Sequence, residues 1–408
     1  MRSPAALIAA VVATGLSLGT GPRAEVQPSL RIGASVSQTG SFAALGQSQL
    51  RGYQLCVKHA NEKGGVLGRR IELLAEDDQS NAATAGAIYE RLITRDKVDA
   101  ILGPYGSPIT EAVADVTEKH KMPMVAPGAA TTSIFKKGRR FIFMVLPGAE
   151  VWLEGLVEMA ATKGLKTLAL INEDTIFPKA AAQGTIGLAK KKGLQVVLTE
   201  AYPKGTIDFS GILSKVRAAN PDVLVASTYF DDAVAITRQS KALNLNPKMF
   251  VVTGGGDLPT FYEMLSRDAE FVYSYLVWDS QLVTLRAGGL IPIARQYPGA
   301  REFVESYKKA FPGAYISSTS AAGYAGCQIF LEAVKRAGSL ESEKVRDVIL
   351  KTDLHTVFGA FKVDRDGSQI AHKVLMFQWQ DGKKVIVWPE ELAPVKARFP
   401  TPPWSQRP

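Results

Sequence analysis

Residues 100–126 read AILGPYGSPITEAVADVTEKHKMPMVA. A short apolar run, Ala100 to Gly103, leads through a turn rich in glycine and proline into a segment, Pro108 to His120, that we expect to be a helix. A second apolar run, Pro123 to Ala126, completes a strand–helix–strand unit. Because both runs are apolar throughout, the unit is typical of a parallel sheet that helices cover on both faces.

The same alternation extends along most of the chain. Before this unit, we expect strands at Leu30 to Val36 and Ile71 to Ala75, and helices at Gln47 to Asn61 and Ala82 to Thr94. After residues 146–148 a second series begins, with strands at Thr167 to Ile171, Gln195 to Leu198, Val223 to Ser227 and Phe250 to Val252, and helices near Pro178 to Lys192, Phe209 to Ala218 and Asp232 to Leu243. Since 408 residues exceed what one core normally serves, the pattern predicts an α/β protein with two doubly wound parallel-sheet lobes.

The first residues predict a secretory signal peptide. Arg2 precedes an apolar run from Ala5 to Leu18 and a stretch of small residues that ends near Ala24. The run is shorter than the roughly 20 residues that a membrane-spanning helix requires, and no cysteine follows it as a site for a lipid anchor. We therefore expect residues 1–24 to be removed and the mature chain to be a soluble periplasmic protein without direct membrane insertion.

The chain is basic, with 48 Lys and Arg residues against 39 Asp and Glu residues and a formal net charge of +9. Loss of residues 1–24, which contain Arg2 and Arg23 and no acids, would leave 9 − 2 = +7. No block of basic residues with interleaved aromatics occurs, so nucleic acid is not expected as a partner. The excess of positive charge favours anionic ligands slightly.

Residue types that carry catalysis or bind metals are scattered. None of the four histidines lies at metal-ligand spacing from another histidine or a cysteine, and no nucleophile elbow, zinc-protease or phosphate-loop motif occurs. We therefore expect no catalytic residues, no metal and no cofactor. The two cysteines, Cys56 and Cys327, both lie in predicted helices, where a disulfide and two buried thiols are equally compatible with the sequence.

Two turns that follow predicted strands are candidate ligand sites, because ligands of open α/β sheets collect at the carboxyl ends of strands. In the first turn, residues 103–107, Ser107 is expected at the N-cap of the next helix, where free N–H groups attract a carboxylate. In the second, residues 126–133, small residues let a ligand approach the backbone and hydroxyl groups offer hydrogen bonds. Simple helix capping and a plain surface loop explain the same residues at least as well.

Seven short motifs stand in a specific order along the chain, although each is unspecific alone. They are IGA at 32–34, QTGSFAALG at 38–46, NEKGGVLG at 61–68, DDQS at 77–80, ILGP at 101–104, APGA at 126–129 and DFS at 208–210. In this order and spacing the chain resembles the leucine/isoleucine/valine-type (type I) periplasmic solute-binding proteins of ABC importers. The resemblance covers Leu30 to Pro389.

The resemblance implies two lobes joined by three crossings of a hinge, near Leu146, Leu276 and Phe358. The ligand would lie in the cleft between the lobes, and lobe closure would present one shape to a membrane permease. Lobe 1 would comprise residues 25–146 and 277–357, lobe 2 residues 147–276 and 358–392, and the C-terminal tail residues 393–408, with a Pro-rich end, Pro400 to Pro408, that we expect to be disordered.

The resemblance also assigns roles in the cleft, where lobe 1 would hold the ligand carboxylate and lobe 2 would close over it. The carboxylate would be held by Ser107, Gly128 and Ala129 and the other polar group by Thr131 or Thr132; the further candidates are Tyr229, which would close from lobe 2, Phe177 in an aromatic wall, Phe42 beside Leu45 at the rim of lobe 1, Tyr105 and Asp257. No metal ligand is among them.

One departure from the family pattern concerns the ligand ammonium group. Amino-acid binders of this family commonly have a carboxylate directly after the strand that corresponds to Phe250 to Val252, and here Thr253-Gly254-Gly255-Gly256 delays Asp257. A buried ammonium without a partner carboxylate is costly. Asp231 and Asp232, next to Tyr229, could substitute, so an amino acid and an aromatic or aliphatic acid both remain candidate ligands.

These features favour a monomeric transport receptor that binds a small solute without turnover and delivers it to an inner-membrane ABC permease with its cytoplasmic ATPase. A ligand sensor on the same fold, docking on a signalling partner, is the alternative, since fold does not settle function. An exported enzyme would require titratable groups such as Asp77, Asp231 and Asp257 to converge on the cleft.

Overall fold

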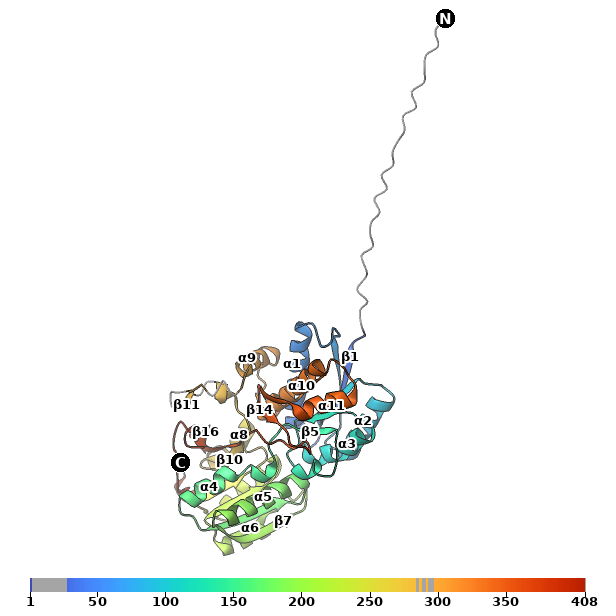
Figure 1. Cartoon of the computed structure of the whole chain (residues 1–408). Coiled ribbons are helices and arrows are strands. Elements are labelled where there is room, and N and C mark those ends of the chain that lie inside the picture. The colour runs from blue at the N-terminus through green and yellow to red at the C-terminus, as the bar shows by residue number, and fades with distance from the viewer. Residues whose placement is uncertain (2–27, 284–285, 288–290, 293–296, 408) are drawn as a thin grey trace.

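The computed structural model describes residue 1 and residues 28–283, 286–287, 291–292 and 297–407. The predicted signal peptide, residues 1–24, lies outside these ranges apart from Met1. Two separate sheets, one of five strands and one of seven, form the centres of two α/β lobes (Figure 1). The predicted fold class, with two doubly wound parallel-sheet lobes, is therefore confirmed.

Five parallel strands form the lobe 1 sheet in the order β2-β1-β3-β4-β5. The strands are β1 (Leu30–Val36), β2 (Ile71–Asp77), β3 (Ala100–Leu102), β4 (Met124–Ala126) and β5 (Ile142–Met144). The helices are α1 (Ala43–Glu62), α2 (Ala82–Thr94), α3 (Ser107–Lys119), α9 (Ala300–Ala310), α10 (Ser318–Ala337) and α11 (Ser342–Lys351). Figure 1 shows that α10 and α11, which come late in the chain, lie in the same lobe as α1 and β1.

Seven strands form the lobe 2 sheet in the order β16-β15-β10-β9-β8-β6-β7, in which β15 is antiparallel to both of its neighbours, β10 and β16. The strands are β6 (Thr167–Glu173), β7 (Gln195–Tyr202), β8 (Val223–Ser227), β9 (Met249–Val252), β10 (Tyr273–Leu276), β15 (Leu375–Gln380) and β16 (Lys383–Trp388). The helices are α4 (Glu154–Thr162), α5 (Ile176–Lys191), α6 (Ser210–Ala219), α7 (Phe230–Ala242) and α8 (Pro259–Leu265).

The parallel parts of both sheets have the same order, so the winding reverses at β1 in lobe 1 and at β6 in lobe 2. At such a reversal the loops on the two sides diverge and leave a crevice at the carboxyl ends of the strands. Two hairpins lie outside these sheets: β11 (Arg286–Ala287) with β12 (Ile291–Pro292), and β13 (Asp353–Thr356) with β14 (Gly359–Lys362).

The apolar strand sequences account for the core of each lobe. Every residue of β3, β4, β5, β8 and β9 is buried, as expected for strands covered on both faces. The predicted bounds of α2 and β8 agree with the structure, whereas α1 begins at Ala43 rather than Gln47, and β5, α4, α8 and β13 to β16 were not predicted. Within the described ranges, no helix combines the length and apolar character that crossing a bilayer requires.

The two cysteines form a disulfide bond. Cys56 in α1 and Cys327 in α10 have Cα atoms 6.3 Å apart and join segments separated by 271 residues. Both cysteines are buried. Of the two states compatible with the sequence, the structure contains the bonded one, which ties the late helices of lobe 1 to its first helix.

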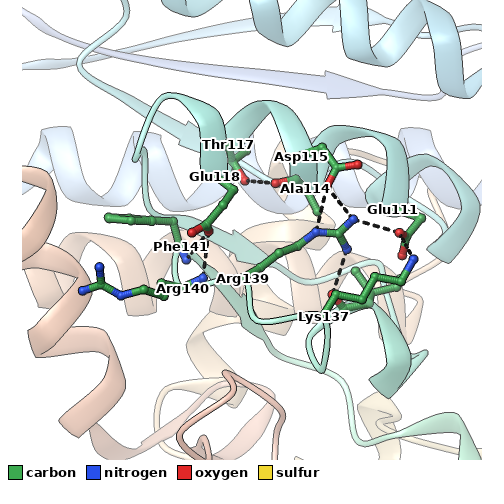
Figure 2. A network of polar contacts seen from close by, with 10 residues as sticks. Glu111, Ala114, Asp115, Thr117, Glu118, Lys137, Arg139, Arg140 and Phe141 are labelled. Atoms are coloured by element: carbon green, nitrogen blue, oxygen red, sulfur yellow. Dashed lines mark hydrogen bonds and ion pairs between the residues drawn. The ribbon is translucent and has the colours of Figure 1, made fainter.

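A buried arginine fixes α3 against the segment between β4 and β5 (Figure 2). The Arg139 guanidinium donates to Glu111 at 2.8 Å and to Asp115 at 2.7 Å, and also to the carbonyl oxygen of Ile134 at 2.8 Å. Glu118 of the same helix accepts the backbone N–H groups of residues 140 and 141. These contacts hold the axis of α3 in place, and its N-terminus points at the crevice of lobe 1.

The disorder predicted for Pro400 to Pro408 is wrong for residues 400–407. The Trp404 ring is buried, and its indole N–H donates to the carbonyl oxygen of Leu245 at 2.8 Å. The Thr401 N–H donates to the carbonyl oxygen of Lys248 at 3.0 Å, and Arg407 covers the Trp404 ring at 3.4 Å. A high proline content predicted disorder, but one buried aromatic residue anchors the segment on lobe 2.

Candidate functional site

A small cavity lies between the lobes, at the carboxyl ends of both sheets. Of the residues proposed from sequence, seven line it: Leu45 at the rim of lobe 1, and Tyr105, Ser107, Gly128, Phe177, Tyr229 and Asp257. Lining residues that were not proposed as ligand contacts include Trp152, Tyr275, Ala130, Gly254, Gly255, Ser318 and Thr319. The free volume is about 50 Å³, room for a few water molecules only. The lobes are therefore closed around the site.

The lobe 1 wall is built mainly from backbone. Gly106, with φ +91°, precedes the first residue of α3, which is Ser107. Ser107 was predicted to cap this helix, and that prediction is wrong, because Gly106 occupies the N-cap position. The Ser107 hydroxyl instead accepts the Ala130 N–H at 3.2 Å and thereby joins the turn after β3 to the turn after β4.

The two turns of lobe 1 pack too closely for a side chain at their contact. The Gly106 N–H donates to the Gly128 carbonyl oxygen at 3.0 Å. A Cβ atom at Gly128 would lie 2.7 Å from the Pro104 oxygen and from the Tyr105 Cα. The first turn of α3 has no acidic residue, and its Pro108 has no N–H group, so the positive end of the helix and the remaining free N–H groups have no acidic side chain of that turn as a partner.

Six aromatic rings form a continuous chain around the cavity. Ring centroids are separated by 5.8 Å between Tyr105 and Phe42 and by 5.0 Å between Phe42 and Tyr229. The chain continues through Phe177 at 5.4 Å and Trp152 at 5.0 Å, and ends with the contact between Trp152 and Tyr275 at 4.2 Å. Phe42 does not line the cavity; it connects the lobe 1 ring of Tyr105 to the lobe 2 ring of Tyr229. The wall is thus apolar and rigid.

The lobe 2 wall carries the polar side chains. Asp257 is the only carboxylate among the described lining residues, and burial raises the pKa of its carboxyl group above the ordinary value. The Tyr229 hydroxyl is buried and has no hydrogen-bond partner within the described part of the chain. Burial also raises the pKa of Tyr229 and Tyr275, so both hydroxyls stay protonated and can donate hydrogen bonds.

The other proposed residues lie near the cavity but do not line it. Ala129 and Thr131 belong to the second turn, and both residues are buried. The Thr132 hydroxyl donates to Glu150 at 2.7 Å, across the lobes. Of the carboxylates that could have substituted for Asp257, Asp231 is exposed and Asp232 accepts the Tyr202 hydroxyl at 3.0 Å.

The groups that an enzyme would require do not converge. Asp77 accepts the backbone N–H groups of Gln38 and Thr39 and so holds the turn after β1, and only Asp257 of the three candidate carboxylates lines the cavity. Among the described residues, no three His, Cys, Asp or Glu side chains are placed to hold a metal ion. The arrangement can satisfy an anion on one side and a cation on the other, with apolar rings between them.

Comparisons with known proteins support the family and the two-lobed fold. A family model described as "Periplasmic binding protein" matches residues 29–384. Leu/Ile/Val-binding protein homolog 7 of Brucella abortus is 29% identical over 409 residues, which span 97% of this chain and 99% of that protein. The crystal structure of a leucine-binding protein from Thermotoga maritima has a TM-score of 0.77 at 25% identity, over 88% of this chain and 97% of that one.

A more distant structure shows the same fold with another kind of ligand. A solute-binding protein of an ABC transporter from R. palustris, solved in complex with benzoate, has a TM-score of 0.75 at 18% identity. The match covers 90% of this chain and 98% of that chain. At this level of identity the likeness concerns the fold alone.

Proposed function

This chain belongs to the periplasmic binding protein family, and from that premise we propose that it is the extracytoplasmic receptor of an ABC importer. It captures a small carboxylate-bearing solute between its lobes and delivers it to an inner-membrane permease. Binding is its whole task, and the solute leaves unchanged.

The observation that carries this proposal is the pairing of opposite walls. The N-terminus of α3 suits a ligand carboxylate, because helix N-termini attract anions. On the opposite wall Asp257 suits an ammonium group. The aromatic rings that line the rest of the cavity suit a compact apolar side chain. Of the two ligand classes left open by the sequence, we therefore favour an amino acid with an apolar side chain over an acid without an amino group.

The relatives support the same ligand class. Their names refer to leucine, isoleucine and valine. Because the Thr132–Glu150 hydrogen bond and the contact between the Phe42 and Tyr229 rings join the lobes beside the cavity, a ligand enters while the lobes are apart. Opening would bend the chain at the crossings that we place near Leu146, Leu276 and Phe358, and Leu146 and Val277 already line the cavity.

Thermal shift and titration calorimetry test this proposal with the mature protein after unfolding and refolding, which removes bound solute. We expect leucine, isoleucine or valine to raise the melting temperature, because a ligand that binds only the folded state stabilises it. Asp257→Asn should abolish the shift, and Lys383→Met, at an exposed position on β16, is the matched control. A shift with no compound in a panel of amino acids and of aromatic and aliphatic acids would contradict the receptor proposal.

Delivery to a permease needs a separate measurement. In proteoliposomes that contain an ABC permease and its ATPase as candidate partners, the liganded receptor should stimulate ATP hydrolysis, and the ligand-free receptor should do so less. Stimulation of a sensor kinase instead would support the alternative role in signalling.

A further inference from the structure

A buried lysine lies behind the lobe 2 wall of the cavity. The Lys384 side chain on β16 is 10% exposed, and its ammonium donates to Asp279 at 2.5 Å. It also donates to the Tyr315 hydroxyl. Asp279, itself 6% exposed, follows β10 in the segment that leaves lobe 2, and Tyr315 precedes α10 of lobe 1. Three segments distant in sequence therefore meet at one cation.

This cluster reaches the cavity through Asp257. The Tyr315 hydroxyl is 3.4 Å from the backbone oxygen of Asp257, and the indole N–H of Trp379 donates to the adjacent Gly256 oxygen at 2.9 Å. Burial raises the pKa of Asp257 and the Asp279 carboxylate adds to this, whereas the Lys384 ammonium lowers it. The tyrosine hydroxyls that face Asp257, those of Tyr105 and Tyr275, have raised pKa values and stay neutral.

The buried charges of the cluster do not balance. The Lys384 ammonium forms an ion pair with Asp279 and acts on the Asp257 carboxylate only through its charge, so the cluster carries one excess negative charge when all three groups are ionised. An uncompensated charge away from water is unfavourable. A ligand ammonium beside Asp257 would neutralise it. Without Lys384, the Asp257 carboxylate would lose the ammonium that lowers its pKa, so its pKa would rise further.

We propose that Lys384 is a positioning residue for the ligand ammonium: it favours the ionised form of the Asp257 carboxylate beside the cavity and, through the Tyr315 hydroxyl of lobe 1, holds the Asp257 backbone in the closed arrangement of the lobes. This inference rests on the proposed function, since it assigns the ammonium subsite of the same cavity. Lys384 itself does not contact the ligand; it acts through Asp257.

The first arm of the test is a pH profile of leucine affinity by calorimetry. Wild-type affinity should change less than about threefold between pH 6 and pH 8.5. Lys384→Met should bind leucine at least about tenfold more weakly at pH 6 and recover most of the loss at pH 8.5, where the Asp257 carboxylate ionises again. Lys384→Arg should resemble the wild type, and Lys383→Met should behave as the wild type at both pH values.

The second arm needs no ligand, so it separates failure of this inference from failure of the proposed function. In ligand-free protein the melting temperature of Lys384→Met should fall further below that of the wild type as pH rises from 6 to 8.5. The sign follows because a carboxyl group with a raised pKa in the folded state binds its proton more tightly there, and this stability is lost as pH rises through that pKa. Adding Asp257→Asn should remove most of this pH dependence.

Several results would overturn the inference. If Lys384→Met loses leucine affinity equally at both pH values, the lysine is merely structural. The same conclusion follows if Asp257→Asn leaves unchanged the pH-dependent fall of the melting temperature in Lys384→Met. Binding of 4-methylpentanoate, which is leucine without its amino group, as tightly as leucine overturns the ammonium subsite but leaves the receptor role intact. If Lys384→Met does not fold, Lys384→Gln keeps a donor for Asp279 and is measured in its place.

Discussion

The two walls of the cavity recognise a ligand by different physics. The lobe 1 wall consists of a helix N-terminus and two glycine-containing turns, whose dipoles do not titrate. The lobe 2 wall consists of aromatic rings and one carboxylate, which depends on the buried Lys384 for its charge. The difference teaches that backbone groups of fixed geometry can hold the carboxylate that all candidate solutes share. Side chains of the other lobe then determine which of these solutes binds.

The largest effect is expected from breaking the lobe 2 wall. Asp257→Asn should weaken leucine binding at least about 100-fold, or about 3 kcal/mol, because the ligand ammonium then lacks its buried partner. The same change should leave 4-methylpentanoate binding within about threefold. Calorimetry with both ligands checks this, and an equal loss for the two ligands would show that Asp257 shapes the site without recognising the amino group.

Breaking the lobe 1 wall should affect every carboxylate ligand equally. In Gly128→Ala the new methyl group meets backbone at 2.7 Å, so the two turns must separate and the affinity for leucine and for 4-methylpentanoate should fall together, about 30-fold. Gly86→Ala in α2 is the matched control, because nothing lies within 4 Å of its Cβ position. A loss confined to leucine would contradict the assignment of this wall to the carboxylate.

Acid pH should weaken the binding of leucine through the lobe 2 wall, where the carboxylate of Asp257 titrates. Because burial raises the pKa of Asp257, its carboxylate becomes protonated at a higher pH than that of a free aspartate, and leucine affinity should decline, about tenfold, as pH falls through that pKa. The Asp257→Asn variant should lack this decline. Two results together would argue against an ionised Asp257 in the site: a wild-type leucine affinity that does not change with pH, and an Asp257→Asn variant that still binds leucine.

The smallest effect is expected at Ser107. Ser107→Ala removes the acceptor for the Ala130 N–H, and the lobe 1 turns stay joined by the hydrogen bond from Gly106 to Gly128. We expect about fivefold weaker binding, or about 1 kcal/mol, for carboxylates with or without an amino group. Ser107→Thr, which retains the hydroxyl, is the control; a loss above 100-fold would mean that the hydroxyl itself holds the ligand.

The sequence predicted the fold well because its strands are continuous apolar runs. The strand Val223 to Ser227 has the predicted bounds, since such a run has no stable alternative to burial, and the helix Ala82 to Thr94 has the bounds that its periodic apolar residues predicted. The missed strand β5 (Ile142–Met144) has only three residues after a basic stretch, too few for a periodic signal. The antiparallel strands β15 and β16 follow long-range pairing that local sequence does not carry.

The candidate site was harder to predict because it depends on backbone geometry. Ser107 was expected as an N-cap, yet Gly106 takes that place with a positive φ angle. Thr132 turns toward Glu150 because a short 3₁₀ helix begins there. Trp152 and Tyr275 are indistinguishable from core aromatics in sequence, and only the pairing of the two lobes brings them to the cavity. Asp257 seemed too far along the chain, but the preceding glycine turn delivers it to the wall.

The most direct test of a receptor for amino acids is a pair of titrations on one refolded preparation, with leucine and with 4-methylpentanoate. The two ligands share the carboxylate and the apolar body and differ in the ammonium group alone. We predict that leucine binds at least about 100-fold more tightly than the acid. Equal or tighter binding of the acid would contradict the central claim that the two walls recognise opposite charges of one ligand.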